Sequence, residues 1–482
     1  MKSAIFATLL ICVFLLSVDG QTSADLILIN ANIRTMDTRV PKAEALAVAN
    51  GRILAVGKTI EIRKLATDKT RVIDAAGKLV LPGFNDSHVH FTGIGNQFSH
   101  LDARQLRKRQ EVLDRIAFYA SVLPRGRWII GAGLSLSSNE MPTIAQIDAV
   151  SPDNPVLIYL ADHKFAMVNS AALKRAKISA AEAVVSNELV TRIRGQVPLD
   201  HERNWPEISE TASNYAASLG VTSVQDVHSD DLFAILNTLA ESGKLKTRVY
   251  ECVGISDRRK AISAGYRAAT GNSVVRRGCV KGFTHGSDDE LAELTDAIAE
   301  SDKAGLHVMI HAIGERSNTT ALTAFEKAIV ANGRRDRRFR IEHAARMTPG
   351  DVRRLSRSNI IASMQPHLFG AGSDDLRAMM DSNVTLAFGS DASITDLNPL
   401  FGIHAAVNSG GRSLTVDEAV RAYTLGSAFA EFQESQKGLL AVGKLADLVV
   451  LSDDIFTVDT NKIRDAKVLI TVVHGKVAFE AK

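Results

Sequence analysis

Five residues in this sequence have side chains that bind divalent metals, and each lies at the end of a short apolar segment. His88 and His90 stand two residues apart near the end of segment 83–91. Because side chains alternate between the two faces of a strand, both imidazoles point to the same face. The other three candidates end later apolar segments: His311, His343 and Asp391. Imidazole and carboxylate groups are ligands of zinc and related ions, so the pattern predicts a metal site.

The strands that position these residues belong to one repeating series. Eight short apolar segments alternate with helical patterns, and we expect strands at 83–91, 221–227, 248–254, 279–285, 307–313, 340–345, 360–365 and 385–391. Repeated strand–helix units predict an α/β fold with a closed (β/α)8 TIM barrel, in which chemistry lies at the C-terminal ends of the strands. An open doubly wound sheet is the alternative, although no Gly-x-Gly-x-x-Gly turn follows a strand.

Both ends of the chain are rich in strands, and hairpins are expected around Asn50-Gly51 and His474-Gly475. We expect residues 21–82 and 436–482 to form one small β-sandwich, with the barrel at 83–435 between them. Separate sheets at the edges of the barrel are the alternative. Residues from about 92 to 220 contain their own strands and helices, and we expect them to form an insertion over one rim of the barrel.

The first twenty residues have the pattern of a signal peptide. Lys2 precedes an apolar run over residues 4–18, and Gly20 provides a small residue at the cleavage site. The run is shorter than the roughly 20 residues that span a bilayer, although an uncleaved anchor is the alternative. We therefore expect export to a periplasm or to the outside, with no stable membrane span after residues 1–20 are removed.

Charge and cysteine content exclude several classes of protein. Lys plus Arg number 57 and Asp plus Glu number 54, so the formal net charge of +3 is too balanced to suggest nucleic-acid binding. Arginine clusters within 104–109, 334–340 and 353–357 are interpreted as solvated loops and helix faces. Cys252 and Cys279 lie in apolar segments, and we expect them to be buried small hydrophobic residues rather than a disulfide.

Longer motifs surround the metal-binding candidates. They include Leu81–Phe91 (LPGFNDSHVHF), Gly220–Asp226 (GVTSVQD), Arg340–Ala344 (RIEHA), Phe388–Asp391 (FGSD) and Gly443–Val450 (GKLADLVV). On these motifs the sequence resembles the amidohydrolase superfamily over nearly the whole mature chain. Within it, the sequence is most similar to the YtcJ-like branch (amidohydrolase 3), which includes N-substituted formamide deformylases.

The resemblance implies a TIM barrel with a β-sandwich built from both chain ends, and it implies roles for the candidates. His88 and His90 would bind one divalent metal, with zinc as the expected ion. His311 and His343 would bind a second ion or help to bind a single one, giving one or two ions per chain. Asp391 would contact the first metal and act as general base toward the attacking water.

Lys281 matches a lysine that is carbamylated and bridges two metals in many relatives. A neutral amine can take up CO2 and become an anionic carbamate, whereas the alternative is a lysine that extends to the barrel rim. Relatives usually carry Asp-Gly-Ser after this lysine, but this chain has His285-Gly286-Ser287. This change alters the expected substrate pocket compared with the pockets of relatives. Three histidines are candidates for binding substrate there: His163, His285 and His367.

These features predict a metal-dependent hydrolase that cleaves an amide or other C–N bond of a small molecule through a metal-activated water. A non-catalytic binding or regulatory relative is one alternative, since the change at His285 alters the pocket. A metal hydrolase of esters or phosphoesters is another, because the same activated water attacks those bonds. Relatives often form dimers, so a homodimer is one expectation.

Overall fold

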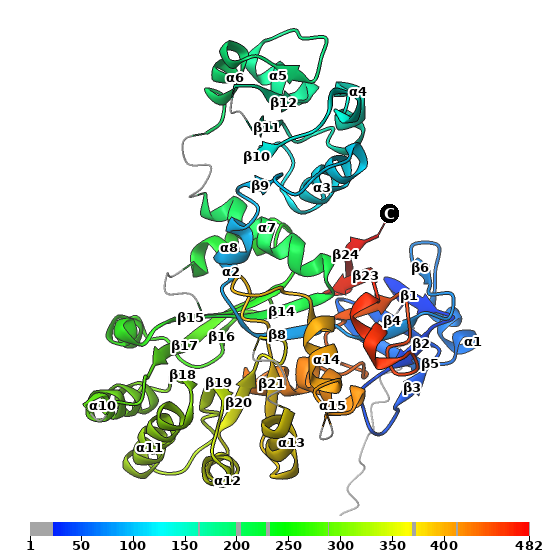
Figure 1. Cartoon of the computed structure of the whole chain (residues 1–482). Coiled ribbons are helices and arrows are strands. Elements are labelled where there is room, and N and C mark those ends of the chain that lie inside the picture. The colour runs from blue at the N-terminus through cyan, green and yellow to red at the C-terminus, as the bar shows by residue number, and fades with distance from the viewer. Residues whose placement is uncertain are drawn as a thin grey trace, which may run out of the picture.

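A computed structural model describes residues 23–161, 164–198, 204–227, 232–287, 289–368, 373–410 and 413–481. Eight parallel strands form its centre and pair in chain order (Figure 1). They are β8 (Phe84–Val89), β14 (Val221–Asp226), β15 (Arg248–Gly254), β17 (Val275–Phe283), β18 (His307–Ile313), β19 (Arg340–Ala345), β20 (Ile361–Met364) and β21 (Leu386–Phe388). All eight overlap the segments expected from the sequence.

The segment that follows β21 closes the gap between the last and the first strand. Val89 and Ala392 form a parallel bridge, and the Asp391 N–H donates to the His88 carbonyl at 2.8 Å. The fold is therefore a nearly closed (β/α)8 barrel, and the open sheet is excluded. Closure brings Asp391 next to His88, although these residues come from opposite ends of the strand series.

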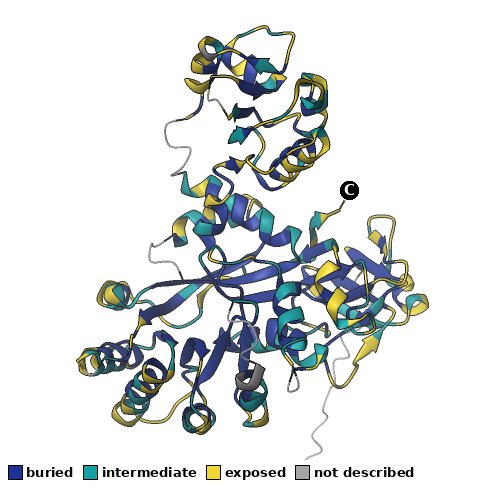
Figure 2. Cartoon of the chain, viewed as in Figure 1, coloured by how far each residue is buried: buried dark blue, intermediate teal, exposed yellow. Residues whose placement is uncertain are grey.

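Helices surround the barrel and present their polar faces to solvent (Figure 2). On α10, for example, Leu294 and Ile298 are buried and lie one turn apart, as expected for an amphipathic helix on a core. The helices between the barrel strands and after them are α8 (Phe233–Glu241), α9 (Arg258–Ser263), α10 (Glu290–Lys303), α11 (Glu315–Asn332), α12 (Pro349–Ser358), α13 (Ser373–Asp381), α14 (Pro399–Val407), α15 (Val416–Arg421) and α16 (Ser427–Ala430).

Two further sheets pack beside the barrel and enclose a core of their own. In the second sheet, β7 from the N-terminal part pairs with β22 from the C-terminal part, and Val80 lies opposite Val450. The first sheet has the order β5 (Arg52–Gly57), β4 (Ala45–Ala49), β1 (Leu26–Ile29), β6 (Arg71–Asp74). The second has the order β24 (Lys476–Glu480), β23 (Val468–Val473), β22 (Leu448–Leu451), β7 (Leu79–Pro82), β2 (Asn32–Arg34), β3 (Lys42–Ala43). Both expected hairpins are present, as β4–β5 and β23–β24.

The chain between β8 and β14 forms a separate lobe, which lies beyond α2 (Phe91–Asn96) and α7 (Trp205–Ser218) in Figure 1. Gly95 allows these two helices to approach, since a Cβ there would come within 2.1 Å of the Ile208 carbonyl oxygen. The lobe's sheet has the order β13 (Val184–Val185), β12 (Ala166–Val168), β11 (Val156–Leu160), β10 (Ile129–Leu134), β9 (Leu101–Asp102). Helices α3 (Arg109–Val122), α4 (Ile144–Val150), α5 (Ser170–Ala176) and α6 (Asn187–Arg194) cover this sheet.

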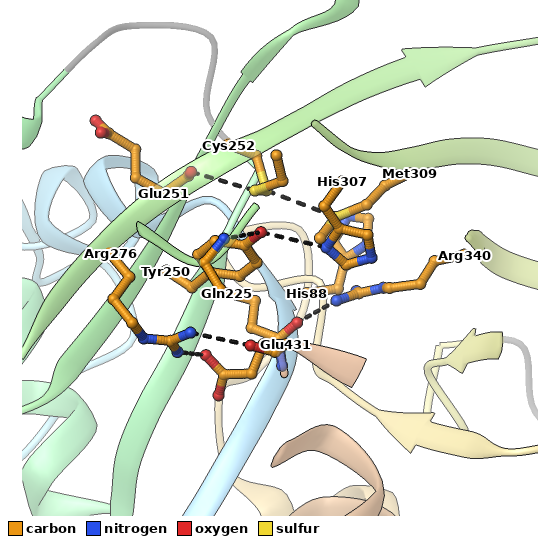
Figure 3. Close-up of a disulfide and its surroundings, with 12 residues drawn as sticks. His88, Gln225, Tyr250, Glu251, Cys252, Arg276, His307, Met309, Arg340 and Glu431 are labelled. Carbon is orange, nitrogen blue, oxygen red and sulfur yellow. Dashed lines mark hydrogen bonds and ion pairs between the residues drawn. A yellow bond between two sulfur atoms is a disulfide. The ribbon is translucent and has the colours of Figure 1, made fainter. Parts of the chain in front are cut away.

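The barrel interior holds a buried polar network rather than only the bulky aliphatic side chains common in such barrels. Arg340 is fully buried and donates to Gln225, to the Ser87 carbonyl and to Glu342. His307 lies nearby between Tyr250 and Arg340 (Figure 3). Its ring nitrogens contact the Arg338 carbonyl at 2.7 Å and the Tyr250 hydroxyl at 3.3 Å.

The buried His307 predicts a pH-dependent contribution to stability. Burial is the main cause that lowers its pKa to about 3, from an ordinary 6.5. Below pH 6.5 the unfolded chain therefore binds a proton that the folded chain does not. The free energy of unfolding should fall with decreasing pH by about 1.4 kcal/mol per unit for this group, until the folded pKa is reached. Urea unfolding at pH 7, 6 and 5 should show a shallower decline for His307→Gln, and equal slopes would contradict the prediction.

Cys252 and Cys279 form a disulfide, which corrects the expectation of two free thiols. The expected burial of both residues is confirmed, at 0% and 1% exposed. The two cysteines are opposite each other because β15 and β17 pair with Cys252 in register with Cys279. Figure 3 shows Cys252 beside Met309 and Tyr250 in the barrel interior. The register of two strands joined by a long connection cannot be obtained from cysteine spacing.

The expected signal peptide at residues 1–20 lies outside the described residues. In the part of the chain that the structure describes, no helix has the length and apolar character needed to cross a membrane.

Candidate metal centre

Three candidate ligands meet at the C-terminal end of the barrel. The Nε2 atoms of His88 and His90 lie 3.5 and 3.4 Å from Oδ1 of Asp391. One potential ligand atom from each residue lies within 4.8 Å of the other two. His88 and Asp391 are buried, whereas the His90 side chain is 34% exposed. The group is therefore set into the barrel and open to solvent on the His90 side.

A buried carboxylate ties the two strand ends that carry these ligands. Oδ1 of Asp86 accepts hydrogen bonds from the backbone N–H groups of His88 and Ser390, each at 3.0 Å. Asp391 itself has a φ of 63°, in the left-handed region that Asp adopts more readily than most residues. This turn directs the Asp391 side chain toward the histidines of the first strand.

The donors present fit a divalent metal ion. Oδ1 of Asp391 is buried and accepts no hydrogen bond from the described residues. Such an oxygen is costly to bury unless it gains a partner. Two imidazole nitrogens face this same oxygen, and two imidazoles with one carboxylate make a donor set typical of zinc.

The other expected ligands lie beside this group. The His343 ring centroid is 4.8 Å from that of His88 and 4.5 Å from that of His311. Lys281 is only 4% exposed, and its Nζ lies 4.7 Å from the Phe283 ring centroid. The Phe283 ring in turn lies 5.1 Å from that of His311. The structure therefore gathers all six sequence candidates at one end of the barrel.

Burial holds two histidines of this cluster, His88 and His311, in the form that binds metal. It is the main cause that lowers the pKa of His88 to about 3 and that of His311 to about 4. Neutral imidazole is the metal-binding form. Burial alone would raise the pKa of Asp391, but His90 and the other nearby histidines outweigh that effect and lower it. Asp391 is therefore ionised at neutral pH and can accept a proton or bind a cation.

The arrangement agrees with a comparison of the whole sequence to known families. The sequence model described as "Amidohydrolase family" matches residues 71–479, which is most of the chain. The protein belongs to the amidohydrolase family. This membership confirms the resemblance carried by the motifs around His88, His343 and Asp391.

Individual relatives of this amidohydrolase match nearly end to end. Protein LONG AFTER FAR-RED 3 of Arabidopsis thaliana is 31% identical, over 94% of this chain and 91% of its own length. The N-substituted formamide deformylase of Arthrobacter pascens is 27% identical, over 95% of this chain and 98% of its own length. Among solved structures, an uncharacterized metal-dependent hydrolase from Pyrococcus furiosus is 25% identical with a TM-score of 0.62, and the match covers 90% of this chain and all of that one.

Family membership and the metal-binding geometry together give the class of reaction. The amidohydrolase is an enzyme that uses a divalent metal and hydrolyses C–N bonds. The expected reaction class is thus confirmed, and its small-molecule substrate follows from it.

Two residues that orient the candidate ligands were missed by the sequence analysis. Glu342 is fully buried, and its Oε2 lies 2.6 Å from Nδ1 of His88. Oε1 of Gln365 lies 2.7 Å from Nδ1 of His343. Each contact occupies the Nδ1 side of a histidine and leaves its Nε2 available, as outer partners of metal ligands do. The only sequence signal was a glutamate between Ile341 and the candidate ligand His343.

Glu342 and His343 are consecutive residues, yet both contact His88. Strict alternation along a strand would place their side chains on opposite faces. The left-handed φ of 72° at His343 interrupts the regular alternation within β19 and redirects that side chain. Glu342 remains ionised because, although burial raises its pKa, Arg340 and His88 lower it well below the ordinary value.

The Glu342→Gln variant of the amidohydrolase should bind zinc about 10- to 100-fold more weakly, as is usual when a partner of a metal-bound histidine is changed. Glutamine retains the size of the side chain but removes the charge that orients His88. Chelator competition at neutral pH measures this affinity. Glu315→Gln, at an exposed glutamate near the same end of the barrel, is the matched control. Equal zinc affinity in the two variants would contradict the orienting role.

The structure describes two of the three weaker substrate-binding candidates, His285 and His367. His163 lies outside the described residues. His285 is exposed, and its backbone N–H donates to Glu290 at 3.0 Å. Nε2 of His367 lies 2.8 Å from the Thr395 hydroxyl and 3.2 Å from the Asp396 carbonyl. His367 therefore holds the loop that follows Asp391.

Proposed function

We propose that this amidohydrolase uses one or two zinc ions to hydrolyse an amide of a small molecule, with Asp391 as the general base. One observation carries the proposal. The Nε2 atoms of two imidazoles converge within 3.5 Å on a buried carboxylate oxygen that accepts no hydrogen bond from the described residues. His88, His90 and Asp391 would hold the first ion, and His311 and His343 would hold a second or complete the shell of a single one.

The chain's own groups account for the proton transfers. A divalent ion bound here would polarise both a water molecule and the substrate carbonyl. Asp391, kept ionised by its neighbours, accepts the proton of the attacking water as the C–O bond forms. It then donates that proton to the amine nitrogen as the C–N bond breaks. The position of His90 on the solvent side leaves room for substrate to approach.

Lys281 is suited to become a bridging carbamate. Burial is the main cause that lowers its pKa to about 8, so a substantial fraction of the amine is neutral near that pH. The neutral nitrogen can attack CO2, forming an N–C bond as one C–O π bond opens and releasing one proton, which converts the neutral amine into an anionic oxygen ligand. The close approach of Lys281 to the histidine cluster supports the role of bridging carbamate over that of a lysine that extends to the barrel rim.

The metal content per chain tests the proposal. It is measured for the unchanged protein and for the Lys281→Ala variant after both have been loaded with zinc and bicarbonate. Elemental mass spectrometry should find close to two metals per chain, falling in the variant. About one metal in both proteins would overturn the bridging role of Lys281 and leave a single-metal hydrolase. The absence of metal from both would overturn the proposed function.

The enzyme's location is also a proposal. The signal-like segment 1–20 and the Cys252–Cys279 disulfide both support export, because disulfides persist mainly in oxidising compartments. N-terminal sequencing of the protein recovered outside the cytoplasm should begin at Gln21. Recovery of the intact N-terminus from the cytoplasm would contradict export.

A further inference from the structure

A cavity of about 710 Å³ lies at the end of the barrel opposite the metal centre. Its walls include residues 334–339, which lead into β19, and residues 355–360, which lead into β20. Residues 383–385, before β21, complete the same side. These segments precede the strands, whereas His343 lies near the C-terminal end of β19 and Asp391 follows β21, so the cavity is separate from the candidate metal centre.

Two arginine clusters that are far apart in the sequence line this one cavity. Arg334, Arg335, Arg337 and Arg338 come from the first cluster, and Arg357 comes from the second. From the sequence alone, both clusters are expected to be solvated loops and helix faces. The fold brings them together because α11 and α12 lie side by side and their C-terminal ends face the same side of the barrel (Figure 1).

Three of these guanidinium groups have acidic partners. Arg335 and Arg337 both contact Oδ1 of Asp302, at 2.5 and 2.8 Å. Arg338 contacts Glu434 at 2.8 Å and also Asp336. Within the described part of the chain, by contrast, Arg334 and Arg357 form no ion pair or side-chain hydrogen bond. Two positive charges at the cavity are therefore left without an acidic partner.

The base of the cavity is apolar. Phe339, Leu355 and Ile360 line it and are almost fully buried from solvent. Val330 stands at the same cavity with 84% of its surface exposed, which is unusual for a large aliphatic side chain. The combination of an apolar base with unpaired guanidinium groups matches a ligand that has an apolar body and an anionic group.

We propose that this cavity binds a small organic anion with an apolar body and one carboxylate or phosphate group. Arg334 and Arg357 would hold the oxyanion through charge-assisted hydrogen bonds, for which the planar guanidinium is well suited. Phe339 and its apolar neighbours would contact the body of the ligand. A cavity with unpaired positive charge also concentrates anions from solution.

Isothermal titration of the full-length, zinc-loaded enzyme tests the site, with phenyl phosphate and benzoate as the two anionic probes. Benzyl alcohol lacks the charge and inorganic phosphate lacks the apolar body, so both should bind at least about tenfold more weakly than the better anion. The stronger of the two anionic probes identifies which acid group the site prefers. The double variant Arg334→Ala/Arg357→Ala should lose at least about tenfold in affinity for that probe.

Arg353→Ala is the matched control, because Arg353 is an exposed arginine of α12 that does not line the cavity. Its affinity for the probe should equal that of the unchanged enzyme. Thermal melting should confirm that all variants fold, as expected for arginines without partners. Failure of both anions to bind saturably at millimolar concentration would overturn the proposal. Binding that persists in the double variant would also overturn it, since such binding would reside at the metal centre.

Discussion

The Asp391→Asn variant is expected to fold normally and to lose about 10²- to 10⁴-fold in kcat, the range that general acid–base catalysis contributes. Asparagine occupies nearly the same volume but cannot take a proton from water at neutral pH. The carboxylate it replaces is held ionised by His90 and neighbouring histidines and faces the cluster at which the attacking water would be deprotonated. Steady-state rates on a panel of formamides and N-acyl amino acids would measure the loss.

Two controls separate the loss of the base from other effects of Asp391→Asn. Thermal melting shows whether the barrel still closes, because the Asp391 backbone N–H that donates to His88 is unchanged. Zinc content shows whether the variant retains its metal. Full activity with normal zinc content would remove Asp391 from the reaction. A rate loss that is fully restored by excess zinc would assign it a role as ligand only.

The His88→Ala variant is expected to lose zinc and, with it, nearly all activity. His88 is buried, faces Asp391, and is fixed by Glu342 at 2.6 Å, so its removal takes one oriented nitrogen out of the ligand set. Loss of a partner of a metal ligand alone costs about 10- to 100-fold in affinity, and loss of the ligand itself should cost more. Zinc per chain after dialysis against a weak chelator would measure the effect.

His404→Ala provides the matched control for that experiment. His404 lies on α14 and contributes no atom to the cluster of three ligands. Its zinc content should equal that of the unchanged enzyme. If the His88→Ala variant retained its zinc and its rate as the control does, the first metal site would have to be built from other residues.

Much of the fold could be predicted because each strand carries its own local signal. The segments 307–313 and 340–345 correspond residue for residue to β18 and β19. Their apolar runs are bounded by polar residues and turn signals, which depend only on near neighbours in the chain. The candidate ligands could be predicted for the same reason, since each stands where a local apolar run ends.

The contacts that orient those ligands depend on how strands pair across the barrel, and local patterns in the sequence do not indicate this pairing. Glu342 reaches His88 only because a closed barrel places β19 across the interior from β8. The Cys252–Cys279 disulfide likewise depends on the register between β15 and β17. His367 could be recognised as a residue near the barrel mouth, but its hydrogen bonds to the loop after Asp391 required the folded chain.

The sequence by itself determined the order of the elements, the α/β class of the fold and the residue types of the metal centre. All of these follow from local patterns of apolar and polar residues. Only the tertiary structure decided which side chains share a site. It joined Asp391 to His88 by closing the barrel, placed Glu342 behind His88, and brought the two arginine clusters to a single cavity. The physical reason is that barrel closure and helix packing act between residues far apart in the chain, where hydrophobic periodicity carries no information about distance or register.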